Sequence, residues 1–311
     1  MGPGSSLRYA RDDGAFELNA MLYDLLIGPF AEFDFMRRAL IGIVALSLSG
    51  APVGVFLMLR RMSLTGDAMA HAILPGAALG YLVAGFSLPA MTLGGLAAGF
   101  AVALAAGAVA RLTVLKEDAS LAAFYLISLA LGVTLVSLRG SAVDLFHVLF
   151  GNVLALDDEV LLLLASVASI TLATLALVYR PLVMECVDPG FLRSVSRSGG
   201  FVHLTFLGLV VLNLVAGFHA LGTLLAVGLM MLPAAAARFW TADITRLILT
   251  ATGFGILSGY AGLVASYAAG SNLPAGPAVI LAAGTLYLGS LLFGSQGGLA
   301  RRLLPRAHLQ R

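Results

Sequence analysis

The feature that most constrains the fold is a series of apolar runs, each about as long as a bilayer is thick. A helix needs about 20 mostly apolar residues to cross the hydrocarbon core, and such runs recur between residues 39 and 295. They do not alternate apolar with polar residues, which excludes the pattern of a membrane β-barrel. Hydrophobic residues make up 60% of the chain and charged residues 11%, unlike a soluble domain. The sequence therefore predicts an all-α, polytopic transmembrane helical bundle.

Eight or nine spans are expected within a single transmembrane domain, residues 37–296. The predicted spans are 39–59, 65–85, 89–111, 119–138, 160–179, two within 201–237, 245–268 and 276–295. The stretch 201–237 is too long for one crossing, and we place its break between Gly217 and Gly222. Residues 1–36 are predicted to be a polar and interfacial segment, residues 139–158 a loop with a surface-lying helix, and residues 297–311 a basic cytoplasmic tail.

The number of spans depends on the side of the membrane assigned to each end of the chain. If the basic tail is cytoplasmic and nine spans alternate, most loop arginines fall on the cytoplasmic side, as the positive-inside rule expects. Arg37 and Arg38 are then external. The alternative is that one assigned span is re-entrant and the total is eight. Both counts remain open from the sequence.

Composition also excludes several kinds of chemistry. Cys186 is the only cysteine, so disulfides and thiolate clusters within one chain are excluded. Lys116 is the only lysine and follows a leucine, so the Gly-Lys-Ser/Thr of a Walker A loop is absent. Any ATP hydrolysis must come from a partner subunit. The HExxH motif is absent, no nucleophile–base pair stands out, and a net charge of +2 gives no indication of nucleic acid. We expect a transport subunit without enzymatic activity.

Asp67 and His71 are the residues most indicative of function. Their spacing places both side chains on one face of a helix, one turn apart. If the chain is helical from Arg61, His71 lies roughly 15 Å inside the membrane, and an ionisable pair at that depth is a functional hypothesis by default. Carboxylate and imidazole suit zinc, and also manganese or iron. The alternative is that Asp67 caps the helix and His71 bonds a carbonyl. Two ligands do not close a metal site, so a second copy or another span must complete it.

The other histidines and glycines of the spans have simpler interpretations. His203 and His219 are expected to be interfacial residues rather than ligands. Two Gly-x-x-x-Gly pairs, formed by Gly76 with Gly80 and by Gly95 with Gly99, are expected to allow close helix packing.

A second candidate segment follows Gly228. Small residues after Pro233 are expected to form a short helix that ends at Arg238, Phe239 and Trp240, with Asp243 capping the next span. An aromatic and basic knob on the cytoplasmic side suits docking into a groove of a soluble partner. The alternative is an ordinary interfacial Trp and Arg at a helix end.

Four stretches of the sequence resemble the zinc/manganese-type ABC transporter permeases. They are Arg60–Gly76 (RRMSLTGDAMAHAILPG), Leu149–Leu154, Gly228–Arg238 and Leu273–Pro277, and the resemblance spans roughly residues 36–296. The implied architecture is that of a type II ABC importer-like permease, which forms a homodimer in the bacterial inner membrane. The implied partners are cytoplasmic ATPase subunits and a periplasmic metal-binding protein.

The resemblance assigns roles to both candidate segments. Asp67 and His71 match positions associated with the metal path. The positions matched to ATPase coupling are Leu232, Pro233, Ala234, Ala235, Arg238, Phe239 and Trp240. The expected cargo is zinc, with manganese next, and no cofactor is expected to be bound permanently. Two alternatives remain open: an ABC permease for an iron chelate or a cobalamin-like cofactor, and a proton-coupled secondary metal transporter.

Overall fold

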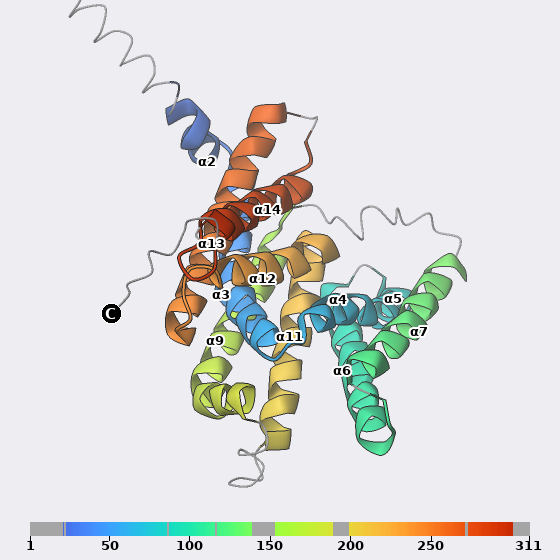
Figure 1. The fold of residues 1–311 in the computed structure, drawn as a ribbon. Helices are drawn as coiled ribbons and strands as arrows, with labels where there is room; N and C mark the ends of the chain where they lie inside the picture. The colour runs from blue at the N-terminus through green and yellow to red at the C-terminus, as the bar shows by residue number, and fades with distance from the viewer. Residues whose placement is uncertain are drawn as a thin grey trace, which may run out of the picture.

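The computed structural model describes residues 21, 23–85, 87–115, 117–138, 153–188, 199–270 and 273–300, and every regular element in them is a helix (Figure 1). The helices are α2 (Gly28–Glu32), α3 (Asp34–Leu59), α4 (Ser63–Ala72), α5 (Leu74–Ala84), α6 (Leu88–Leu112), α7 (Glu117–Leu138), α9 (Asp158–Val187), α11 (Gly199–Leu221), α12 (Thr223–Ala237), α13 (Ile244–Ala269) and α14 (Ala275–Phe293). Eight stretches of these described residues are long and apolar enough to cross a membrane, with α4 and α5 together forming one of them. The predicted all-α membrane bundle is confirmed.

The predicted spans match the helices closely, with one correction. The expected break within 201–237 is confirmed at Gly222, where φ is 83° and α11 gives way to α12. The second predicted span is confirmed as one spanning stretch, Ser63–Ala84, within which α4 and α5 separate at Ile73. The fifth predicted span is wrong at its end, since α9 continues through Pro181 to Val187. A proline is tolerated in a membrane helix where neighbouring groups satisfy the freed carbonyl.

Helix α12 differs from the other spans in length. Its 15 residues are fewer than the roughly 20 that a full crossing requires. Trp240, which follows α12, bonds Ser290 near the end of α14, and Tyr179 of α9 bonds Thr245 at the start of α13. The expected count of eight or nine spans therefore depends on whether this short apolar helix is counted as a crossing.

The predictions for the terminal and loop regions fall partly outside the described residues. Residues 1–20, 139–152 and 301–311 lie outside them, so most of the expected surface helix and of the basic tail do too. Within the predicted interfacial segment, α2 is a separate short helix, and the Phe30 ring stacks on Tyr260 of α13.

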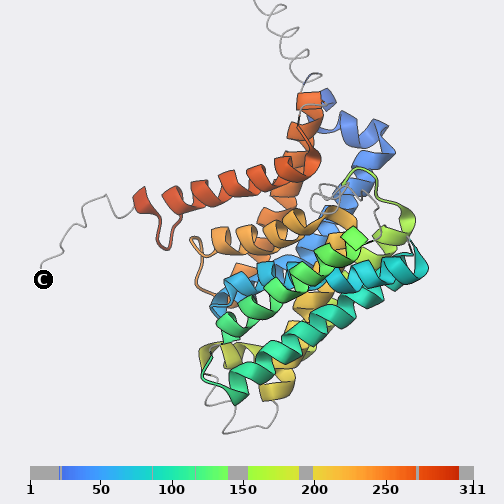
Figure 2. The ribbon, with the colours of Figure 1, turned by 90° about the vertical axis from the view of Figure 1, so that its right-hand side faces the viewer.

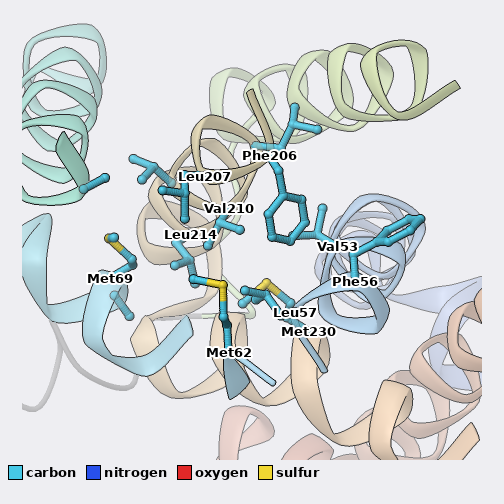
Figure 3. Packing of buried hydrophobic residues seen from close by; sticks show 14 of the residues in the cluster. Val53, Phe56, Leu57, Met62, Met69, Phe206, Leu207, Val210, Leu214 and Met230 are labelled. Carbon is cyan, nitrogen blue, oxygen red and sulfur yellow. The ribbon is translucent and has the colours of Figure 1, made fainter. Parts of the chain in front are cut away.

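The largest buried cluster joins the first span to the helices that surround it. Figure 3 shows Val53, Phe56 and Leu57 of α3 facing Phe206 of α11 and Met230 of α12. Met62 and Met69 extend this cluster from the start of α4 and from α4 itself (Figure 3).

The helices on either side of this core form two pairs. Helices α6 and α7 pack together on the side where α4 and α5 lie, while α13 and α14 pack together on another side (Figures 1 and 2). Helix α4 is therefore held between the core and α7.

Candidate metal site

The candidate site lies on α4, a helix of ten residues bounded by two backbone breaks. The break at Ile73 follows from Pro75, which has no N–H to donate to the carbonyl of His71. Ser128 of α7 donates from its Oγ to the carbonyl oxygen of Ala72 at 2.9 Å, and so satisfies a second acceptor exposed by the break. The neighbouring helix thus stabilises the end of α4 that carries the histidine.

Asp67 and His71 lie one turn apart on the same face of α4, as predicted. His71 Nε2 and Asp67 Oδ1 are 3.9 Å apart, too far for a direct hydrogen bond. Zinc bonds imidazole nitrogen and carboxylate oxygen at about 2.0–2.2 Å, so one ion between the two atoms could contact both. The arrangement is therefore suited to bridging by a cation.

The capping alternative for Asp67 is wrong. Helix α4 begins at Ser63 with Met62 as its N-cap residue, so Asp67 lies inside the helix. Its side chain is 63% exposed, whereas that of His71 is 24% exposed. An exposed carboxylate within a helix of membrane-spanning composition is costly in lipid. Such a carboxylate is expected to face protein or a water-filled path rather than lipid.

Tyr125 of α7 is the neighbour of the site that spacing along the chain does not predict. Its ring stacks on the His71 imidazole, with centroids 6.2 Å apart and planes at 29°. His71 Nδ1 is buried without a hydrogen-bond partner in the part of the chain that the structure describes. Among those residues no third His, Cys, Asp or Glu joins the pair in a group that could hold a metal. The described residues thus bring together two candidate ligands, fewer than the four of a closed metal site.

The segment predicted to couple to an ATPase is partly buried. Pro233 and Ala234 are buried inside α12 rather than starting a separate helix, which corrects that expectation, and Leu232 and Ala235 are half-buried. Arg238 is exposed, and Trp240 is 43% exposed.

The turn after α12 is fixed by the chain's last described residues. Trp240 donates from Nε1 to Ser290 Oγ at 2.9 Å, and the Ser295 hydroxyl donates to the Trp240 carbonyl at 2.8 Å. The Gln296 N–H donates to the Phe239 carbonyl at 2.8 Å. The expected cap is present: Asp243 Oδ1 accepts from the N–H of Arg246. The accessible part of the predicted segment is this braced turn, residues 238–240.

The two other histidines take part in bonds within the protein. His219 Nδ1 is 2.8 Å from the Val215 carbonyl oxygen of its own helix. His203 lies beside Arg60 and Glu185. The interfacial expectation for His203 did not include this pairing, because Glu185 lies between the predicted spans 160–179 and 201–237.

A multi-helix membrane bundle with a carboxylate–imidazole pair on a broken span is an arrangement suited to transport. The chain matches the model of the ABC 3 transport family over residues 32–294. The chain belongs to this family.

Individual relatives agree over most of the chain. It is 32% identical over 275 residues to the manganese transport system membrane protein MntC of Listeria monocytogenes, covering 88% of this chain and 96% of the relative. It is 31% identical to the manganese import system permease protein ScaB of Streptococcus parasanguinis, covering 84% and 91%. Its fold is similar to PsaBC from Streptococcus pneumoniae, solved in complex with Fab. That match has a TM-score of 0.77 and 28% identity over 87% of this chain and 96% of that one.

Proposed function

We propose that this chain is the membrane permease of an importer that uses a partner's ATP to move a divalent transition metal, manganese or zinc. The observation that carries the proposal is the Asp67–His71 pair on a broken membrane helix, with Asp67 exposed, His71 partly buried and 3.9 Å between His71 Nε2 and Asp67 Oδ1. Relatives named as manganese transporters favour manganese. The imidazole favours zinc, which binds nitrogen ligands more strongly. The order of preference, with zinc first, stays a prediction from the sequence.

The exposed carboxylate supports a homodimer. Covering Asp67 with a second copy would remove the charge from lipid. It would also bring a second Asp67 and His71 toward the first pair, and four ligands suffice for a metal site. The cation is then bound between two copies, as cargo rather than as a resident cofactor.

The bundle end that carries Arg60 is proposed to be cytoplasmic in a bacterial inner membrane. At this end Arg60 and Arg61 follow α3, Arg238 follows α12 and Arg246 lies in the first turn of α13, in agreement with the positive-inside rule. The accessible turn at Arg238–Trp240 is then available to ATPase subunits. A periplasmic binding protein would deliver the metal at the opposite end.

The test is metal uptake by the chain assembled with its ATPase and binding protein in proteoliposomes. Asp67→Ala and His71→Ala are each expected to abolish ATP-dependent uptake of manganese and zinc while leaving assembly with the ATPase intact. Asp118→Asn, an exposed carboxylate at the start of α7, is the control and should transport normally. Full uptake in both site variants would refute the assignment of the pair. Uptake by the chain alone under a proton gradient would instead identify a secondary transporter.

A further inference from the structure

A buried cluster of charged and polar side chains joins three helices at the end of the bundle where α4 begins. Arg60 follows α3, Glu185 lies near the end of α9, and His203 lies near the start of α11. Arg60 donates from Nη2 to Glu185 Oε1 at 3.0 Å and to His203 Nδ1. The side chains of Arg60, Glu185 and His203 are 9%, 10% and 13% exposed. The Arg60 guanidinium also lies over the Phe206 ring, 4.9 Å from its centroid.

This cluster is a poor source of stability by itself. Arg60 Nη1 and Glu185 Oε2 are buried with no hydrogen-bond partner among the described residues, so part of their lost hydration is not replaced. Well-packed apolar side chains commonly serve at least as well as a buried ion pair. The planar guanidinium group of Arg60 does, however, hold its hydrogen-bond acceptors in a defined geometry. The cluster is therefore better suited to fixing the relative positions of the three chain segments than to adding stability.

The position that the cluster sets is the start of α4. Arg61 directly follows the clamped Arg60 and has a φ of 59°, the left-handed region that a side chain rarely adopts. Such a conformation persists only where the surroundings hold it in place. The Met62 N–H then donates to the Leu57 carbonyl at 2.9 Å, and α4 begins at Ser63. The direction of α4 thus depends on how Arg60 is anchored.

A second ion pair joins the same two helices at their other ends and provides a contrast. Arg38 of α3 bonds Asp158 at the start of α9 at 2.7 Å, but the Asp158 side chain is 86% exposed. An exposed ion pair of this kind contributes little to stability and restrains its side chains little. Because the two ion pairs join matching ends of α3 and α9, these helices run parallel. The ion pair at one end is exposed, and the ion pair beside α4 is buried.

We propose that Arg60, Glu185 and His203 are positioning residues for the metal site. By holding the turn that precedes α4, they set where Asp67 and His71 lie. The position of the pair then depends on the end of α9, which carries Glu185, and on the start of α11, which carries His203. This inference rests on the proposed function for its effect on metal. The geometric part, that the cluster holds α4 in place, stands independently.

The transport test compares the buried Arg60–Glu185 ion pair with the exposed Arg38–Asp158 ion pair. Glu185→Gln keeps the side-chain shape but removes the charge, and Asp158→Asn makes the same change at the other end of the helix pair. Groups that bond a metal ligand directly cost about 10–100-fold in affinity when lost. Glu185 acts on the ligands only through the start of α4, so Glu185→Gln should raise the metal concentration for half-maximal uptake by an amount up to the lower end of that range, about tenfold. The maximal rate per permease in the membrane should change much less. Asp158→Asn should match the parent. An unchanged half-maximal concentration in Glu185→Gln would overturn the proposal.

A distance measurement tests the geometry without metal. Leu64 on α4 and Leu177 on α9 are exposed, at 78% and 83%, so cysteines at both positions can carry spin labels in a Cys186→Ser background. Distributions of the distance between the two spin labels should broaden or shift in Glu185→Gln and remain unchanged in Asp158→Asn. Identical distributions in the labelled parent and both variants would refute the inference that the Arg60 cluster holds α4 in place.

A milder variant and the site variants separate the possible failures. If Glu185→Gln does not accumulate in membranes, His203→Gln replaces it, because it retains the Arg60–Glu185 bond; its spin-label distances should broaden to a smaller extent. An unchanged distribution in His203→Gln would then count against a positioning role of the cluster. If Asp67→Ala keeps full uptake while a cluster variant still broadens the spin-label distances, the proposed function fails and the positioning role stands.

Discussion

Replacing Gly94 with alanine should force α5 and α6 apart. These helices cross with their backbones in contact: a Cβ atom on Gly94 would lie 2.1 Å from the Gly76 carbonyl oxygen and 2.8 Å from its carbon. A Cβ on Gly76 would in turn lie 1.9 Å from the Gly94 carbonyl oxygen. The predicted role of Gly76 and Gly80 in close packing is confirmed. It is also confirmed for Gly99, where a Cβ would lie 2.5 Å from Val211 of α11, while a Cβ on Gly95 would make ordinary contact with Val215.

The size of the effect follows from these distances. Cβ atoms essentially never approach another heavy atom closer than 3.0 Å, so the helices must separate by about 0.9 Å at this point. The obstructing atoms are backbone, so no side-chain rotation can relieve the contact. Overpacking costs about 1–3 kcal/mol, and we expect the upper part of that range. Because α5 begins directly after the Ile73 break, the displacement should also reach His71.

Gly107 is the matched control on the same helix. It has open space where a Cβ would stand, and alanine is favoured over glycine inside a helix by roughly 0.5–1 kcal/mol. Thermal unfolding of the purified protein in mild detergent should therefore show a lower midpoint for Gly94→Ala and an equal or higher midpoint for Gly107→Ala. Equal midpoints for Gly94→Ala and the parent would refute the close contact between α5 and α6.

Three further predictions concern other fixed points of the fold. Gly222→Ala should cost about 1–3 kcal/mol, measured as a lower unfolding midpoint, because φ 83° and ψ 163° are accessible almost only to glycine. Ser128→Ala should cost about 1 kcal/mol and weaken metal-dependent uptake, because it removes the bond to the Ala72 carbonyl at the break beside the site. Trp240→Phe removes the bond to Ser290, and it should lower the metal transported per ATP hydrolysed while the metal affinity stays unchanged.

The sequence was a good guide wherever one local signal dominates. Long apolar runs predicted the spans, because a bilayer admits few other structures. The glycine at position 222 marked the turn between α11 and α12, because its backbone conformation excludes most side chains. The four-residue spacing of Asp67 and His71 placed them on one face, because helix geometry alone decides it.

The sequence was a poor guide where contacts distant along the chain decide. Pro181 suggested the end of a span, but α9 continues past it within the packed bundle, and so Glu185 was assigned to a loop. Its bond to Arg60 spans 125 residues of chain, and no spacing rule predicts such a pairing. Tyr125 was missed for the same reason, since its ring meets His71 only after α7 packs on α4.

The shortness of α4 determines what controls the candidate metal site. A helix of ten residues is too short to be stable by itself, and the backbone is interrupted at Arg61 before it and at Ile73 after it. Its position must then come from its neighbours, which are the Arg60 cluster at one end and α7 with Ser128 and the Tyr125 ring at the other. Neither set of contacts requires a metal. Changes in α7, α9 or α11 should therefore displace the Asp67–His71 pair without altering either residue, and a movement of these helices should shift α4 with them.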